Sequence, residues 1–230
     1  MKTDTYSPAK LSAWLAQSSP QLTTKEGWNI VGGLSAPSKM PCHSYSIPAS
    51  ACKVGQKLAS IAGSVCAGCY AMRGNYRFGN VKSAQQRRLD SLQNPLWIDA
   101  MTAAISGTEG SGFFRWHDAG DLQGAWHLAM IAEVCRRLPS IRFWLPTREV
   151  GFLGEYIAGG GIIPGNLNVR ISALMVDGPT PDTVAQRYGA TVSAVSSSGG
   201  DCKAPEQGGK CLSCRACWSK SVPCVTYKKH

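Results

Sequence analysis

The spacing of apolar residues alternates between strand-like and helix-like segments along the middle of the chain. Short apolar runs predict strands, and segments with apolar residues at helical spacing separate them. The strand candidates are residues 113–117, 141–147, 167–175 and 190–197, and the helix candidates between them are residues 122–138, 151–160 and 180–189. Strand and helix in repeated alternation predict parallel strands joined by right-handed crossovers. We therefore expect an α/β fold, a compact or incomplete (β/α) barrel, with an open doubly wound sheet as the alternative.

The remaining segments predict a single structural domain with four parts. Residues 1–40 hold an N-terminal helix around Ser7–Gln17 and a first strand at 28–34, and residues 41–78 form a cysteine-bearing loop region. Residues 79–199 form the barrel-like core, which begins with helices at 81–93 (capped by Asn80) and 95–106. Residues 200–230 form a cysteine-rich, metal-binding tail. Apolar runs stay below the roughly 18 residues that a membrane span needs. The N-terminus has an early acid and lacks the apolar region of a signal peptide. These features predict a cytoplasmic protein.

The charge balance predicts a polyanionic partner. The chain has 24 Lys and Arg against 14 Asp and Glu, a formal charge of +10, while 43% hydrophobic residues exclude a disordered chain. Aromatic and basic residues alternate after the first cysteines, as in surfaces that bind nucleic-acid strands. The binding candidates are Tyr70, Arg73, Tyr76, Arg77, Arg87, Arg88, Arg115, Arg170 and Ser172. The alternative is a basic but partnerless soluble surface, since a charged helix is often only a solvated face.

Cysteines near the C-terminus predict a metal centre. Cys211, Cys214 and Cys217 are spaced as C-x-x-C-x-x-C, which lets their sulfurs face one ion or cluster. Without an export signal, metal explains ten cysteines better than disulfides. The fourth ligand is Cys202, Cys224 or His230. The sequence leaves zinc and an iron–sulfur cluster open.

A second cysteine group predicts a possible second metal site. Cys66 and Cys69 form a C-x-x-C pair, which Cys42 and Cys52 reach through long loops. Cys135 stands alone in an apolar helix and is expected in the core.

The segment after the strand at 113–117 supplies the catalytic candidates. His117, Asp118 and Asp121 lie where a parallel strand ends, the edge at which such folds place their active sites. Two carboxylates and an imidazole permit nucleophilic or acid–base chemistry. Alternatively, Asp121 is the N-cap of the helix from Leu122, and Asp118 pairs with an arginine.

Five motifs in order resemble a phage protein family labelled gene product eighty-eight, and a phage-encoded protein would lie in the host cytoplasm. They are CAGCYAMRGNY, the basic helix, RWHDAGD, NVRIS and the CxxCxxCW…Y…H tail, and the resemblance runs roughly from Gly33 to His230. A parallel barrel with strand-end aspartates and a late Cys₃His zinc site is also similar to the guanine transglycosylases. These insert 7-deazaguanines into tRNA, and phage relatives act on DNA.

The transglycosylase resemblance implies base exchange in a nucleic acid, with DNA favoured over RNA. Asp118 or Asp121 would attack C1′, guanine would leave, and a free 7-deazaguanine base would replace it. Cys211, Cys214, Cys217 and His230 would bind zinc. The sequence departs from that pattern in its C-x-x-C-x-x-C spacing, where those enzymes have C-x-C-x-x-C, and in its N-terminal cysteine group, which has no counterpart in them.

Two other functions stay open. A C-x-x-C-Tyr unit early in a parallel barrel is similar to radical-SAM-like iron–sulfur enzymes, although thirteen residues separate Cys52 from Cys66 where the usual signature has three. The other alternative is a non-catalytic, zinc-stapled protein that binds nucleic acid. The oligomeric state is not predicted.

Overall fold

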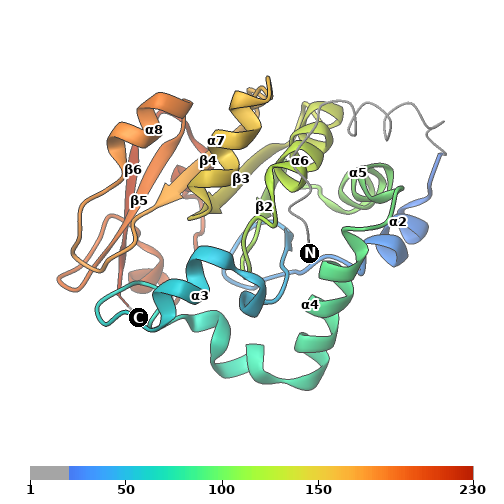
Figure 1. Cartoon of the computed structure of the whole chain (residues 1–230). Coiled ribbons are helices and arrows are strands. Elements are labelled where there is room, and N and C mark those ends of the chain that lie inside the picture. The colour runs from blue at the N-terminus through green and yellow to red at the C-terminus, as the bar shows by residue number, and fades with distance from the viewer. Residues whose placement is uncertain (1–20, 230) are drawn as a thin grey trace.

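Six parallel strands form one sheet in the computed structural model, which describes residues 21–229 (Figure 1). The strands are β1 (Ser44–Tyr45), β2 (Phe113–Trp116), β3 (Arg142–Thr147), β4 (Leu167–Ser172), β5 (Thr191–Ser196) and β6 (Cys224–Lys228). Each strand pairs with its neighbours in sequence, so β1 and β6 are the two edges. The predicted parallel α/β fold is confirmed, and the predicted compact or incomplete barrel is not. A doubly wound sheet reverses its strand order at a switch point, so that alternative is wrong.

Helices follow the strands as crossover connections. The helices are α2 (Thr24–Val31), α3 (Lys53–Ala59), α4 (Gly79–Ser91), α5 (Trp97–Thr108), α6 (Ala125–Arg137), α7 (Val150–Ala158) and α8 (Asp182–Tyr188). Helices α5 to α8 pack in succession along one face of the sheet, and α2 packs on α5 (Figure 1). Right-handed crossovers between strands in sequence order place the helices α5 to α8 on the same face. Among the described helices, none has the length and apolar character to cross a membrane.

Alternating side chains give the sheet two different faces. Phe114, Trp116 and Phe143 are fully buried beneath the helices, in the main hydrophobic core. Their neighbours point to the opposite face, where Trp144 packs against Trp218 of the C-terminal segment. The segment after β5 therefore covers the face that the helices leave open.

The run at 28–34, predicted as a strand, lies mostly in helix α2. Thr23 and Glu26 form a capping box, in which the Glu26 amide donates to Thr23 Oγ1 (3.3 Å) and the Thr23 amide donates to Glu26 Oε2 (2.8 Å). Gly32, with φ of 75°, ends the helix in the left-handed conformation that glycine adopts at low cost. The capping signal was present in the sequence and outweighs the β-branched run.

Other predicted elements agree with the structure except at their ends. The four predicted strands and the helices at 81–93, 95–106, 122–138, 151–160 and 180–189 are all present. Asn80 is not the N-cap of α4, because the helix already begins at Gly79. Strands β1 and β6 were not predicted, and β6 brings the tail into the sheet. The predicted helix at Ser7–Gln17 lies outside the described residues.

Two histidines are buried together between the sheet and α6. His117 follows β2, His127 lies in α6, and their ring centroids are 5.2 Å apart. Burial lowers the pKa of His127 to about 3 and holds the pKa of His117 well below its usual value. Both imidazoles are therefore neutral in the folded protein at neutral pH.

We expect the free energy of unfolding to fall as the pH drops from about 6.5 toward 3. The unfolded imidazoles take up protons in that range and the folded ones do not, so acid favours unfolding. In His127→Gln one of these groups is missing, and the slope against pH should shrink by about 1.4 kcal/mol per pH unit. Urea denaturation of both proteins at several pH values measures the two slopes. Equal slopes would contradict this account of the buried pair.

Candidate functional site

A loop of cysteines crosses the C-terminal ends of the strands. This cysteine loop, residues 46–78, begins after β1 and contains α3. Its Val65 amide donates to the carbonyl of Leu174 (2.9 Å), and the Val176 amide donates to that of Gly63 (2.9 Å). The loop is thereby fastened to the segment that follows β4. Figure 1 shows α3 along the lower side of the sheet, away from α6 to α8.

Three thiols of this loop gather in one place. The sulfurs of Cys52 and Cys66 each lie 3.7 Å from the point that a Cβ on Gly55 would occupy, so both face the same small space. Burial raises the pKa of both thiols, and the nearby Cys69 raises them further. Cys69 is held by a tight turn in which its amide donates to the Cys66 carbonyl (3.2 Å). The positive charge of Arg148 acts in the opposite direction and lowers the pKa of Cys66, but burial outweighs it.

Asp118 holds this loop against β1 and β2. Its Oδ1 accepts from Ser44 Oγ (2.8 Å), and its Oδ2 accepts from the Tyr76 hydroxyl (3.2 Å). The Tyr70 hydroxyl donates to the Asp118 carbonyl. Asp118 is 7% exposed, so its carboxylate serves to position the segment after Cys69.

Asp121 bonds to the end of β3. Its Oδ1 accepts from Thr147 Oγ1 (2.6 Å) and from the Leu122 amide (2.8 Å), and its Oδ2 accepts from the Arg148 amide (2.8 Å). Burial raises the pKa of Asp121 to about 6. It is not the N-cap of α6, because that helix begins at Ala125.

Glu149 is a site residue that the sequence analysis missed. Its Oε1 accepts from the amides of Lys53 (2.8 Å) and Val54 (2.7 Å), the first residues of α3. These follow Cys52 directly, so the carboxylate fixes the start of the helix beside that thiol. Its place directly after the strand at 141–147 was the available signal, because strand ends meet at the functional edge.

The three predicted catalytic residues are thus buried behind the cysteine loop. Asp118 and Asp121 are bonded to donors through both carboxylate oxygens. His117 is 3% exposed and packs on His127, away from the loop. The structure brings the two aspartates to the strand ends as predicted, in positions suited to holding the loop.

The predicted nucleic-acid contacts divide into surface and interior residues. Arg73, Arg77 and Arg87 are exposed. Three others are buried, as a correction to the expectation of a binding surface: Arg88, Arg170 and Ser172. Arg88 donates to the Gly33 carbonyl (2.9 Å) and to two serine hydroxyls, so it serves the fold.

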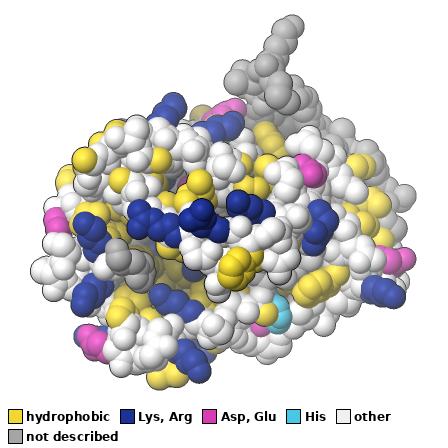
Figure 2. Space-filling model, turned by 90° about the horizontal axis from the view of Figure 1, so that it is seen from below, with side chains coloured by type: hydrophobic (Ala, Val, Ile, Leu, Met, Phe, Trp, Pro, Cys, Tyr) yellow, Lys and Arg dark blue, Asp and Glu magenta, His cyan; other side chains and the backbone are white. Residues whose placement is uncertain are grey.

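The other three predicted contacts lie between surface and interior. Tyr70 is 47% exposed, although its hydroxyl is directed inward to the Asp118 carbonyl. Tyr76 and Arg115 are partly buried, and Arg115 lies 4.3 Å from the ring centroid of Trp144. Seen from below, Lys and Arg side chains form a row beside a hollow with hydrophobic side chains (Figure 2).

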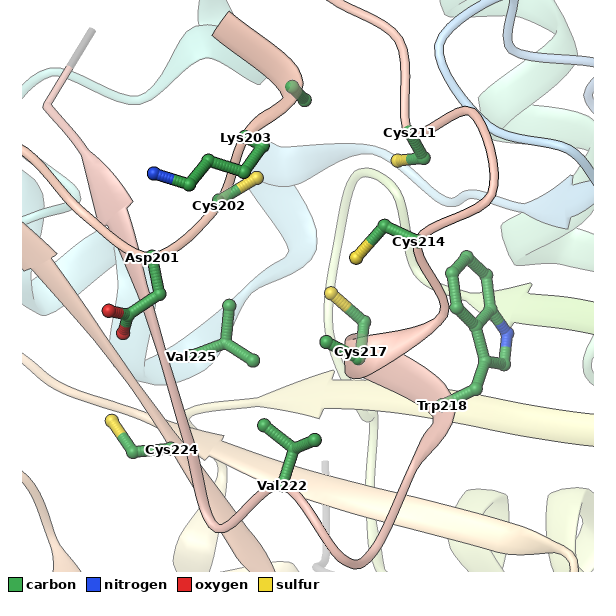
Figure 3. Close-up of a pocket in the computed structure, with 12 residues that line it drawn as sticks. Asp201, Cys202, Lys203, Cys211, Cys214, Cys217, Trp218, Val222, Cys224 and Val225 are labelled. Atoms are coloured by element: carbon green, nitrogen blue, oxygen red, sulfur yellow. The ribbon is translucent and has the colours of Figure 1, made fainter. Parts of the chain in front are cut away.

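Four cysteines of the tail surround a second pocket. The sulfurs of Cys202, Cys211, Cys214 and Cys217 point toward a common space, and Cys224 points away from it (Figure 3). The pocket has a volume of about 70 Å³. Cys224 packs instead against the main core. His230, the other predicted ligand, lies outside the described residues.

Cys42 does not join the thiols of the cysteine loop. It is buried with Trp144 and Trp218 on the tail side of the sheet. Burial raises the pKa of Cys42 to about 12, and nearby groups including Cys211 add to the effect. The expected four-cysteine N-terminal set is therefore a set of three, with Cys42 packed beside the tail.

The chemistry of both donor sets fits a metal group. Among the residues from 21 to 229, no three His, Cys, Asp or Glu side chains converge tightly enough to hold a single metal ion as they stand. Each set nevertheless offers sulfur ligands around shared space. Thiolates are the ligands of iron–sulfur clusters, which require more room than one ion.

Comparisons with known proteins connect the chain to one family. The sequence model of a family described as Gene product 88 matches residues 13–220. No curated protein matches the chain. No solved structure matches it either. The likeness to guanine transglycosylases stays a prediction.

Proposed function

This chain belongs to the gene product 88 family, whose name states no reaction, and we propose a function from its strand ends. The protein is an iron–sulfur enzyme of the radical-SAM-like kind, and Cys52, Cys66 and Cys69 bind its catalytic cluster. One observation carries the proposal: three thiols gather on the loop that crosses the C-terminal ends of parallel strands. This edge is where such folds place their chemistry.

Three protein ligands suit a catalytic cluster better than four. A cluster held by three thiolates supplies one-electron chemistry and keeps one iron available to a small molecule. Six parallel strands in sequence order are also what part of a (β/α) barrel contains. An incomplete barrel of this kind leaves the strand ends open on one side.

The strand-end carboxylates support this role by holding the ligands in place. Glu149 fixes the residues after Cys52, and Asp118 fixes the residues after Cys69. A site is active only when such supporting groups keep its ligands within a narrow geometry. In this role the buried carboxylates position the cysteine ligands and need not contact a substrate.

Aspartate-based base exchange receives less support from the same geometry. A nucleophile needs a free oxygen facing a cavity large enough for the substrate. Both oxygens of Asp118 accept hydrogen bonds from Ser44 and Tyr76, and Asp121 is bonded in the same way. We therefore place base exchange second to the iron–sulfur proposal.

Exposed groups of the cysteine loop support a nucleic-acid substrate, with DNA favoured over RNA. Arg73 and Arg77 follow Cys69 and are exposed. Met72 is 52% exposed and Tyr70 is 47% exposed. Basic groups attract phosphates, and aromatic side chains stack on bases. The row of Lys and Arg in Figure 2 lies on the face seen from below.

Anaerobic reconstitution of the full chain with iron and sulfide tests the proposal. We expect the double variant Cys66→Ser/Cys69→Ser to bind about four fewer irons and four fewer sulfides per chain than the wild type. Adding S-adenosylmethionine to the reduced wild type should change its electron paramagnetic resonance spectrum, and the double variant should lose that change. Cys135→Ala is the control, because its thiol lies in the core away from both sites.

Two results would overturn this function. One is a double variant that binds as much iron and sulfide as the wild type. The other is zinc without sulfide at these three cysteines in protein purified without oxygen.

A further inference from the structure

We propose that Cys202, Cys211, Cys214 and Cys217 bind a second iron–sulfur cluster, in which all four protein ligands are cysteine sulfurs. This centre is separate from the one at the strand ends and does not depend on it. Because each iron of this cluster has a protein ligand, none is available to a substrate. The cluster therefore stabilises the connection from β5 to β6 and carries electrons. Each thiol releases its proton to solvent as its sulfur binds iron.

The four sulfurs come from three different places in the tail. Cys202 is held beside β6, where its amide donates to the Thr226 carbonyl (3.1 Å). Cys211 is held by the Lys39 carbonyl (2.9 Å), and its own carbonyl accepts from the amide of Cys214 (2.9 Å). Backbone contacts that are separate from any metal thus direct the thiols to one pocket (Figure 3).

The size of the pocket favours a cluster over a single ion. Its volume is about 70 Å³, whereas one water needs roughly 10–15 Å³ on the same scale. Four sulfurs at about 2.3 Å from a zinc ion touch one another and leave no such space. Among residues 21–229, no three such ligands converge on a single-ion site, so the space suits a larger cluster better.

The surroundings of the pocket suit a negatively charged group. Arg170 is fully buried on the tail side of the sheet, and no carboxylate among the described residues forms an ion pair with it. The Tyr227 hydroxyl lies 3.1 Å from Cys217 Sγ and can donate to the sulfur. A cluster with four thiolates is anionic, and such donors and charges stabilise it and set its reduction potential.

Cys224 provides a matched control for the ligand assignment. It lines the same pocket, yet its sulfur points away and the residue packs on the core (Figure 3). Its replacement by serine should leave the cluster in place. Cys214→Ser, in contrast, removes a ligand that is exposed and has few other contacts to disturb.

The test uses the variant Cys52→Ser/Cys66→Ser/Cys69→Ser of the full chain, so that the strand-end site no longer contributes. After anaerobic reconstitution we expect about four irons and four sulfides per chain. Adding Cys224→Ser should keep that content, and adding Cys214→Ser should reduce it to below about one iron. Because the strand-end cysteines are absent, failure here is distinct from failure of the proposed catalytic site.

A second variant covers the case in which Cys214→Ser does not fold. Cys214→His keeps a ligand at the position, and histidine in place of cysteine raises the reduction potential of a cluster. We expect retained iron and a higher midpoint potential. Zinc without sulfide, absence of iron, equal losses in the Cys214 and Cys224 variants, or an unchanged potential in Cys214→His would each overturn the inference.

Discussion

Arg170→Met is expected to lower the free energy of unfolding by about 3 to 5 kcal/mol. The guanidinium of Arg170 is fully buried and donates to backbone carbonyls of both β5 and the tail. It reaches Val192 (2.6 Å), Val222 (3.0 Å), Ala216 (3.2 Å) and Ser219 (3.4 Å). Methionine keeps an apolar stem and makes none of these bonds, so buried carbonyls lose their donors and the tail is held less firmly against the sheet.

Urea denaturation of the full chain measures this loss. Arg142→Met is the matched control, because Arg142 is exposed on β3 and its replacement should change stability by less than about 0.5 kcal/mol. If Arg170→Met were as stable as Arg142→Met, the guanidinium would not be what holds the tail. That result would also contradict the structural role that we assign to Arg170 in place of nucleic-acid binding.

Asp118→Ala should destabilise the fold by about 3 kcal/mol, and Asp118→Asn by about 1 kcal/mol. Alanine leaves the Ser44 hydroxyl and the Tyr76 hydroxyl without their acceptor, whereas asparagine keeps one acceptor oxygen. We also expect the alanine variant to lose iron from the strand-end cysteines, because Tyr76 and the residues after Cys69 are released. Denaturation curves and iron content after reconstitution give the two readouts.

A catalytic aspartate predicts a different pattern from a positioning one. If Asp118 were the nucleophile of base exchange, Asp118→Asn would abolish 7-deazaguanine incorporation into DNA while stability and iron content stayed at wild-type values. Asp90→Ala is the control for removing a carboxylate, since Asp90 is exposed on α4. Wild-type stability and iron content in Asp118→Ala would show that Asp118 does not position the loop.

Much of the fold followed from local patterns in the sequence. The strands at 113–117 and 141–147 have apolar side chains at every second position, and the helix at 122–138 has them at helical spacing. Such periods reflect one buried face, which every element on a shared core must have. Strands β1 and β6 were not predicted, because neither shows a clear hydrophobic period. Strand β1 has only two residues, and β6 lies in a cysteine-rich tail.

The sequence by itself determined that the cysteines fall into two groups and that acidic residues follow β2. The tertiary structure alone decided which residues meet. Cys42 lies beside the tail, Cys224 packs on the core, and Asp118 accepts a hydrogen bond from Ser44, 74 positions earlier in the chain. Spacing governs contacts within one turn, whereas contacts between distant residues depend on how the loops run across the sheet. Burial then decides whether a polar side chain faces a ligand or the protein's own backbone.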